Sequence, residues 1–352
     1  MRETPDVTVV VVTWRARDMV LRCLDGLARQ DLDGLRMHVV VVDNDSRDGT
    51  AEAVGAQHPD VEVLVADSNR GFAGGNNLAL RRLGAPVAIL LNNDAVPAPT
   101  FVASLVGHLL GARDDVAAVT SRVLLADRFR PAAPDEPGVT GPDGRWVSSP
   151  DGDVDLVNST GNELRTDGYG VDRGWLCRAD RHRPPRGVFG FCGAGVALRA
   201  SAIQDVGLFD EEFFLYYEDS DLSWRLRLAG YRVEYAADAV IRHEHAASSR
   251  EGSDLFRFHD WRNRLLVLTK DATARRAWAA VLRFVVTTAS VGLRRRGTPG
   301  ETRVRVRVLT SYLRLLPTML RRRHAIGRAA RVARRDVERL LVTPTPSRGL
   351  RS

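Results

Sequence analysis

Two hydrophobic periods alternate along the first 125 residues, and this alternation constrains the fold more than any other feature of the chain. Continuous apolar runs, rich in β-branched residues, predict strands that are buried on both faces of a sheet. These runs cover residues 7–12, 39–42, 61–66 and 87–91. Segments with apolar residues at helical spacing lie between them, and a helix is expected at about 101–110. Strands that alternate with helices predict βαβ units, and therefore an α/β fold with a mostly parallel sheet.

Polar side chains follow each predicted strand at the point where it ends. Thr13, Asp43, the segment 69–75 and the segment 92–94 all occupy such positions. Ligands of open parallel sheets bind beyond the carboxyl ends of the strands, so these residues are the first candidates for a binding site.

The segment Asp43-Asn44-Asp45-Ser46 permits two interpretations. A carboxylate at this place could accept the imide N–H of uracil or thymine. Asp and Ser at a strand-to-helix turn also commonly cap free backbone N–H groups. From these residues alone, capping is the favoured interpretation of the two.

The segment 69–77 holds three glycines, and we expect them to stand just before a helix. Glycine there would let backbone N–H groups approach an anion that the helix dipole attracts. A flexible turn is the alternative. The segment matches neither GxGxxG nor the phosphate-binding GxxxxGKS, and the first strand ends in Thr13-Trp14-Arg15, without glycine. A nicotinamide-dependent dehydrogenase is therefore disfavoured.

Asn92-Asn93-Asp94 directly follows the fourth apolar run. Mg²⁺ and Mn²⁺ take one or two carboxylates and complete their shells with phosphate oxygens and water. Asp94 is placed to be such a ligand, with Asn93 near enough to bond a ribose. A simple turn before Pro97 is the alternative.

Aromatic and acidic residues crowd the segment 209–221. Crowded carboxylates raise one another's pKa, which suits one of them to act as a general base. Asp219 or Asp221 could instead cap a helix at 221–230, with Arg225 as the partner of Asp221. Further on, His243-Glu244-His245 follows another apolar run, and a histidine here could bind a metal, orient a phosphate or be structural.

Taken together, these segments resemble the family 2 glycosyltransferases of the GT-A fold, and most of all bacterial rhamnosyltransferases of cell-envelope polysaccharide assembly. That fold has a Rossmann-like, mostly parallel central sheet flanked by helices. The resemblance covers about residues 7–249, apart from a Pro- and Gly-rich stretch. The matching segments are VVVVTWRARDMVLRCLDGL, VVVVDNDSRDGT, NRGFAGGNN, ILLNNDAVP, GFCGAGVALRASAIQDVGLFDEEFFLYYEDSDLSWRLRLAGYRVEY and IRHEHAASS.

The resemblance implies a role for each candidate. Asp43 would hold the pyrimidine of a nucleotide-sugar, and Asp219 would be the catalytic base. Asp94 occupies the metal-binding position of a DxD-like motif that here reads Asn-Asn-Asp, with His243 chosen over His245 as the histidine near the metal and diphosphate. The other substrate-binding candidates are Thr13, Asn69, Gly71, Asn76, Asn93 and Glu218.

The implied reaction is an inverting, Mg²⁺- or Mn²⁺-dependent transfer of a sugar to a hydroxyl of a lipid-linked or polysaccharide acceptor. The preferred donor is dTDP-L-rhamnose, and a UDP-hexose or UDP-galactofuranose is the alternative. A non-catalytic scaffold that binds nucleotide-sugar is disfavoured because Asp94 and Asp219 are both present.

Charge is distributed unevenly, although the formal net charge is only +7. The first 270 residues carry −9, whereas the 20 arginines and 4 acidic residues from Asp271 onward give +16. Apolar stretches precede arginine triplets at 294–296 and 321–323, an arrangement typical of a helix that lies on an anionic membrane. Nucleic acid is the less favoured partner, because the tail shows no recognisable binding module.

These observations predict a GT-A domain at 1–255 with an irregular insertion at about 128–152. A helical, arginine-rich and membrane-associating extension would follow at 256–341, and a disordered tail at 342–352. Three widely spaced cysteines and no evident leader favour the cytoplasm, with the enzyme peripheral on the inner face of the membrane.

Overall fold

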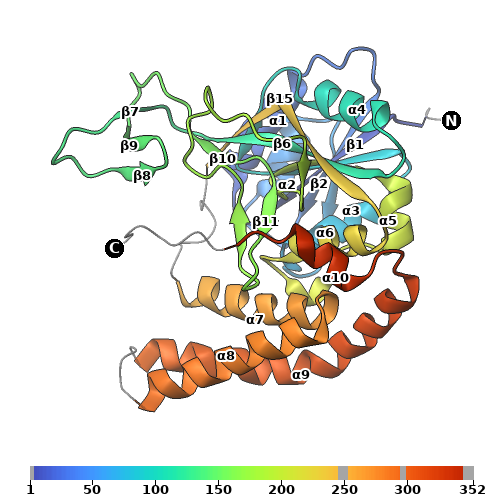
Figure 1. Cartoon of the computed structure of the whole chain (residues 1–352). Coiled ribbons are helices and arrows are strands. Elements are labelled where there is room, and N and C mark those ends of the chain that lie inside the picture. The colour runs from blue at the N-terminus through green and yellow to red at the C-terminus, as the bar shows by residue number, and fades with distance from the viewer. Residues whose placement is uncertain (1–3, 245–252, 294–298, 344–352) are drawn as a thin grey trace.

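The structure is a computed structural model, and it describes residues 4–244, 253–293 and 299–343. A ten-stranded mixed sheet forms its centre, in the order β13-β15-β6-β14-β4-β1-β2-β3, with β10 beside β6 and β5 beside β15 (Figure 1). The four predicted strands are β1 to β4, so the expected α/β class with a mostly parallel sheet is confirmed. The strands are β1 (Val7–Thr13), β2 (Met37–Asp43), β3 (Glu62–Val65), β4 (Val87–Asn92), β5 (Ala95–Pro97), β6 (Val116–Leu125), β10 (Val157–Ser159), β13 (Gly187–Val188), β14 (Gly195–Arg199) and β15 (Arg232–His243).

The register of the parallel strands brings their polar ends together. β1 lies between β2 and β4, and Thr13 stands beside Asp43 while Val12 stands beside Asn92. Each of these strands therefore delivers its first polar residues to one edge of the sheet, as the parallel arrangement requires.

Helices cover both faces of the sheet. Val7, Val9 and Val11 point into one core with α1 and α4, while Val10 and Val40 point into a second core with α3, α5 and α6. Burial on both faces explains why these strands are continuously apolar rather than alternating. The helices are α1 (Arg17–Ala28), α2 (Thr50–Gln57), α3 (Gly71–Leu80), α4 (Phe101–Gly111), α5 (Ala200–Val206) and α6 (Glu218–Leu228).

The stretch 128–152 is not irregular, contrary to its prediction from proline and glycine content. It forms a three-stranded antiparallel sheet of β7 (Phe129–Pro131), β8 (Val139–Gly141) and β9 (Gly144–Ser148). Phe129 and Trp146 anchor this sheet in a small apolar cluster with Leu156, and burial of these large side chains outweighs the local turn signals. A separate hairpin follows, made of β11 (Asn162–Leu164) and β12 (Gly170–Asp172).

The C-terminal region is helical, as expected. α7 (Asp254–Asp271), α8 (Ala274–Leu293) and α9 (Pro299–Ala329) lie side by side beneath the sheet, and a shorter α10 (Arg334–Val337) leads the chain back to it (Figure 1). They bury a third core that includes Trp224, Leu265 and Tyr312. No helix in the described ranges combines the length and apolar character needed to cross a bilayer.

The arginine triplets, which the prediction places on a membrane, are described only in part. Arg294 to Arg296 lie outside the described residues. Arg322 forms an ion pair with Asp210 at 2.5 Å, and Arg323 donates to the carbonyl oxygens of Thr269 and Ala272. Two arginines of the second triplet therefore have partners within the protein, whereas Arg321 is exposed, and the contact of this triplet with a membrane stays a prediction.

Candidate active site

A cleft with a volume of about 400 Å³ opens beside the carboxyl ends of β4 and β15. It brings together residues that lie far apart along the chain, including the predicted Glu218, Asp219 and His243. Other lining residues are Phe72, Asn92, Asn158, Asn162, Gly170, Asp172, Cys192, Gly193, Tyr216, Tyr217, Ser220, Phe256 and Asp260.

Asp219 lies in the first turn of α6, where its carboxylate is held by three elements. The Asn162 side-chain amide donates to Oδ2 at 2.5 Å, and the Gly193 backbone N–H reaches the same oxygen at 3.4 Å. The Ser220 backbone N–H donates to Oδ1 at 2.6 Å. Donors that converge on a carboxylate favour its charged form and fix its orientation.

The pKa values of Glu218 and Asp219 are both raised. Burial is the main cause for each, and the neighbouring Asp219 charge adds to the shift at Glu218, whose pKa lies well above its usual value. The hydrogen bonds from Ser220, Gly193 and Asn162 oppose the shift at Asp219. Glu218 is therefore the group that retains its proton, while Asp219 is the group that ionises first and can accept one.

The segment before Asp219 is a strained loop. Phe214, Tyr216 and Tyr217 all have positive φ angles, between 63° and 69°, which non-glycine residues rarely adopt. Asn263 of α7 is fully buried, and its amide donates to the carbonyl oxygens of Phe213, Leu215 and Tyr216.

Arg262, also of α7, donates to the carbonyl oxygens of Glu212 and Phe213. Together with Asn263, it supplies the donors that this loop cannot find within a regular element. The C-terminal extension therefore forms part of the wall of the cleft.

Asp94 and His243 meet beside the cleft, which His243 lines. Asp94 follows β4, His243 ends β15, and Asp94 Oδ1 lies 3.0 Å from His243 Nε2, with both side chains at most 10% exposed. His243 Nδ1 lies 2.8 Å from Asn158 Oδ1, and Nε2 lies 3.1 Å from the Asn92 amide nitrogen. His245 lies outside the described residues.

The hydrogen bond to Asn158 determines the tautomer of His243. An amide oxygen can only accept, so Nδ1 carries the proton and Nε2 of the neutral ring presents a lone pair. The Asn92 side-chain amide donates to this lone pair, and Asp94 Oδ1 lies beside the same nitrogen, buried and without a hydrogen-bond donor among the described residues. A buried carboxylate oxygen beside an imidazole nitrogen is a donor set that fits a divalent ion. Within residues 4–244, 253–293 and 299–343, no three His, Cys, Asp or Glu residues are grouped as metal ligands.

Thr13, Asp43 and Asn93 lie along the neighbouring edge of the sheet. The Asn93 side-chain amide donates to Thr13 Oγ1 at 3.0 Å, and Asp43 Oδ1 accepts the backbone N–H of Ser46 at 2.9 Å. The turn-forming role considered for Asp43 is thus observed, and it uses one oxygen of the buried carboxylate.

The glycine-rich segment differs from its prediction, because helix α3 begins at Gly71 and contains Gly74 and Gly75. A Cβ atom on Gly75 would stand 2.6 Å from Val12, and one on Gly71 would stand 2.3 Å from the carbonyl oxygen of Phe214. These glycines therefore allow α3 to pack closely against β1 and the loop before Asp219.

Their neighbours Asn69 and Asn76 are also used internally. Asn69 accepts the Gly71 N–H, and the Asn76 amide donates to the Phe72 carbonyl oxygen. Asn44, which sequence reasoning did not select, links these parts: its amide donates to Asn69 and Gly71, and its oxygen accepts the Arg70 N–H.

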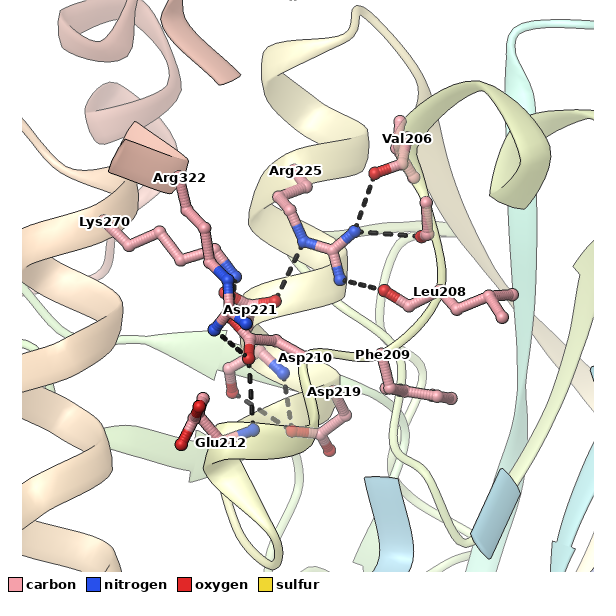
Figure 2. A network of polar contacts seen from close by, with 12 residues as sticks. Val206, Leu208, Phe209, Asp210, Glu212, Asp219, Asp221, Arg225, Lys270 and Arg322 are labelled. Atoms are coloured by element: carbon pink, nitrogen blue, oxygen red, sulfur yellow. Dashed lines mark hydrogen bonds and ion pairs between the residues drawn. The ribbon is translucent and has the colours of Figure 1, made fainter. Parts of the chain in front are cut away.

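A buried ion network lies behind the cleft (Figure 2). Lys270 stands 2.6 Å from both Asp210 and Asp221, and Arg225 contacts Asp221 at 2.9 Å, as its spacing predicted. Burial acts to raise the pKa of Asp221, but Lys270 and Arg225 outweigh it, so the net shift is downward. This network joins α6 of the sheet domain to α7 and α9.

Sequence reasoning missed several residues of the cleft. Asn158, Asn162 and Asn263 stand in short strands or a helix, without a recognisable motif around them. Gly193 stands in a Gly-rich segment that entered the resemblance without a role of its own. Their separation from Asp219 along the chain, 57 residues for Asn162, left no local signal.

The fold is shared with enzymes of the GT-A glycosyltransferase class. The structure of GalNAc-T7 with UDP, GalNAc and Mn²⁺ matches with a TM-score of 0.55 at 13% identity, over 77% of this chain and 48% of that chain. Residues 1–349 of S. aureus TarS match with a TM-score of 0.50 at 15% identity, over 95% of this chain and 90% of that chain.

A sequence model described as glycosyltransferase-like family 2 matches residues 5–257. The chain belongs to this family of glycosyltransferases, which confirms the predicted family.

Two relatives from Mycobacterium tuberculosis illustrate the range of the family. A pre-mycofactocin glycosyltransferase is 31% identical over 257 residues, which cover 70% of this chain but only 44% of the relative. An N-acetylglucosaminyl-diphospho-decaprenol L-rhamnosyltransferase is 28% identical over 225 residues, covering 60% of this chain and 67% of the relative. The chain thus spans less than half the length of the first of these proteins.

Proposed function

We propose that this glycosyltransferase transfers a sugar from a nucleotide-sugar to an acceptor hydroxyl by single displacement with inversion, in a metal-dependent reaction. The observation that carries the proposal is the cleft itself. Asp219, a carboxylate with a raised pKa, and His243 both line it, and Asp94 pairs with His243 beside it.

Asp219 is the proposed catalytic base. Its carboxylate takes the proton of the acceptor hydroxyl as that oxygen attacks the anomeric carbon. The bond from this carbon to the nucleoside diphosphate breaks, and the diphosphate leaves on the opposite face. The donors from Asn162, Gly193 and Ser220 hold the carboxylate in place before the acceptor arrives.

Asp94 and His243 are the proposed ligands of a Mg²⁺ or Mn²⁺ ion. The ion would neutralise charge on the diphosphate leaving group. Asp94 provides a single buried carboxylate, so waters and phosphate oxygens would complete the shell. Replacement of Asp94 by alanine should abolish metal-dependent donor binding, which calorimetry with and without metal would measure.

The edge formed by Thr13, Asp43 and Asn93 is the proposed nucleotide side. Asp43 lies in the buried position suited to a pyrimidine imide, with Thr13 beside it in the sheet. Asn69, Gly71 and Asn76 support this edge through the internal contacts already described, and Glu218 borders the sugar in the cleft.

The proposed donor is dTDP-L-rhamnose and the proposed acceptor is a lipid-linked or polysaccharide hydroxyl. The decaprenol-dependent rhamnosyltransferase relative supports both assignments. A UDP-hexose or UDP-galactofuranose donor is the second candidate, because a galactofuranosyltransferase of Mycolicibacterium smegmatis is 36% identical over 107 residues. Trp278, Leu282 and Val286 are exposed on α8, and they support a peripheral position on the inner face of the cell membrane.

A donor screen tests the proposal directly. dTDP-L-rhamnose, UDP-galactofuranose and UDP-glucose are compared with Mg²⁺, Mn²⁺ or EDTA, and release of nucleoside diphosphate is measured. We expect turnover to require the metal, and we expect nucleoside diphosphate to be released faster from dTDP-L-rhamnose than from the other two donors. Turnover that is undiminished in EDTA would show that the reaction does not need a metal. Faster turnover with a UDP-sugar would show that dTDP-L-rhamnose is not the preferred donor.

A further inference from the structure

A second, basic cleft of about 380 Å³ lies between the turn of the β11–β12 hairpin and helices α7 and α8. Four arginines line it: Arg264, Arg275, Arg276 and Arg283. A smaller hollow of about 100 Å³ continues from it, shares Arg264 and Arg283, and adds Arg305.

The two carboxylates that line this cleft are already paired. Asp167 pairs with Arg165 at 2.7 Å, and Glu338 pairs with Arg276 at 3.3 Å while it also accepts the Thr273 N–H. Arg264, Arg275 and Arg283 form no ion pair within the part of the chain that the structure describes. Three guanidinium groups outside these ion pairs form a site for an anion of more than one charge.

Arg264 is the built-in part of this cleft. It is only 5% exposed, stacks on the Tyr169 ring at 4.3 Å and donates through Nη1 to the Asp167 carbonyl oxygen at 3.0 Å. Its Nε is buried without a hydrogen-bond partner among the described residues. A buried donor without an acceptor is unfavourable, and a phosphate oxygen is an acceptor of the right charge.

An apolar stripe borders the basic cleft on α8. Trp278, Leu282 and Val286 are 72%, 64% and 57% exposed, and their spacing of four residues places them on one face of the helix. Arg275 and Arg283 project beside this face from the same turns. A ligand that fits both surfaces carries an anionic group attached to a hydrocarbon chain.

The basic cleft lies one helical turn from the active-site cleft. Phe256 and Asp260 of α7 line the active-site cleft, and Arg264 follows them at the same spacing. Four residues of helix rise about 6 Å. The two clefts therefore lie along successive turns of the same helix.

We propose that the basic cleft binds the diphosphate of a prenyl-diphosphate-linked sugar acceptor, with the prenyl chain along the α8 stripe. This inference rests on the proposed function, whose acceptor it specifies. It also gives the two clefts different tasks: one performs the transfer and the other holds the acceptor by its lipid end.

Binding of farnesyl diphosphate tests the inference without donor or metal. Calorimetry in EDTA compares the unsubstituted chain with the double variant R275Q/R283Q and with the control R113Q/R232Q, which removes the same charge from an exposed site on Asp115. We expect the first variant to bind on the order of tenfold more weakly or worse, because charge-assisted hydrogen bonds are lost, and the control to be unchanged. Inorganic pyrophosphate and farnesol, which each offer half of the ligand, should bind more weakly than farnesyl diphosphate.

Several outcomes would overturn the inference. If R275Q/R283Q and R113Q/R232Q bound farnesyl diphosphate equally well, Arg275 and Arg283 would not take part in binding. Competition by a nucleoside diphosphate for the bound farnesyl diphosphate would place the diphosphate in the donor site. If R275Q/R283Q lost only its binding to vesicles of phosphatidylcholine and phosphatidylglycerol, the stripe would contact phospholipid instead. Equal competition by a DNA duplex would assign the arginines to general polyanion binding.

The outcome is distinguishable from failure of the proposed function. An Asp219→Asn variant should bind farnesyl diphosphate as the unsubstituted chain does. If the donor screen gave no transfer while this binding held, the basic cleft would stand and the proposed reaction would fall.

Discussion

Two pairs of acidic residues within one short segment are treated in opposite ways. Asp210 and Asp221 are neutralised by Lys270, Arg225 and Arg322 (Figure 2). Glu218 and Asp219, which face the cleft, form no ion pair with any described residue.

The difference separates structural from chemical use of the same residue type. A buried carboxylate with cationic partners has a lowered pKa and holds elements together, as Asp221 joins α6 to α7. A buried carboxylate without them keeps a raised pKa and can exchange a proton. Asp219 and Asp221 stand only two residues apart, and α6 turns the first toward the cleft and the second toward α7.

The largest expected effect is on kcat, when Asp219 of the pair that faces the cleft is replaced. Asp219→Asn keeps the shape and hydrogen-bonding size of the side chain but removes the base, so kcat should fall by about 10²–10⁴. Donor binding and the thermal midpoint should stay close to those of the unsubstituted chain. Steady-state kinetics with the preferred donor, together with calorimetry of donor binding, measure both. Retention of full kcat would exclude Asp219 as the base.

Replacement of Lys270 by methionine should instead lower stability, because Lys270 is the partner of both Asp210 and Asp221. Removal of the shared cation leaves Asp210 and Asp221 without it in the interior, a change worth about 3–5 kcal/mol of unfolding free energy. Urea denaturation measures the loss. Arg232→Met, which breaks the exposed pair with Asp115, is the matched control and should change little. If Lys270→Met and its control were equally stable, the network would not hold the C-terminal helices in place.

A smaller effect is expected when Asn162 is replaced by alanine. Its hydrogen bond favours the ionised form of Asp219, so the pKa of Asp219 should rise further without it. A base must be ionised to act, so the acid limb of the kcat profile should move to higher pH. Loss of a hydrogen bond to a charged group should also lower kcat by roughly tenfold to a hundredfold. A lower kcat with an unmoved acid limb would argue that Asn162 only supports the fold.

The subtlest test concerns the pH dependence of stability. Above about pH 4.3 an unfolded Glu ionises, whereas the raised pKa of Glu218 keeps it protonated in the folded chain. The folded state then binds more protons, so the unfolding free energy falls as the pH rises through this window. Glu218→Gln should flatten that fall, as urea denaturation at a series of pH values would show.

Asp221 supplies the contrast. Its lowered pKa means that its contribution is present above its unfolded pKa and is lost as the pH falls. A Glu218→Gln variant with an unaltered pH dependence would show that Glu218 ionises in the folded chain.

The sequence alone was sufficient for the sheet and for the residues at its edge. Apolar runs carry a strong periodic signal, and parallel pairing then brings Thr13, Asp43 and Asn92 together whatever the loops do. The Arg225–Asp221 pair was equally accessible, because helical spacing alone brings the two together.

Contacts between distant segments could not be predicted in this way. Gly74 and Gly75 resembled a loop signal, yet they lie in α3, because the need to approach Val12 closely outweighs the low helix propensity of glycine. The arginines at 322 and 323 resembled a membrane-facing cluster, but their partners lie more than 50 residues away along the chain. Local composition indicates the charge and flexibility of a segment, but it does not indicate which distant residues will pack against that segment.

Lys270 has one more consequence, because it is the sole lysine among 51 basic residues and its side chain is only 3% exposed. In the folded protein, amine-directed reagents should therefore modify the α-amino group and spare this side chain. Its acylation would report the separation of α7 from α6. Acylation of this one lysine, measured by mass spectrometry, would therefore report whether the contact between α6 and α7 is intact, without an introduced label.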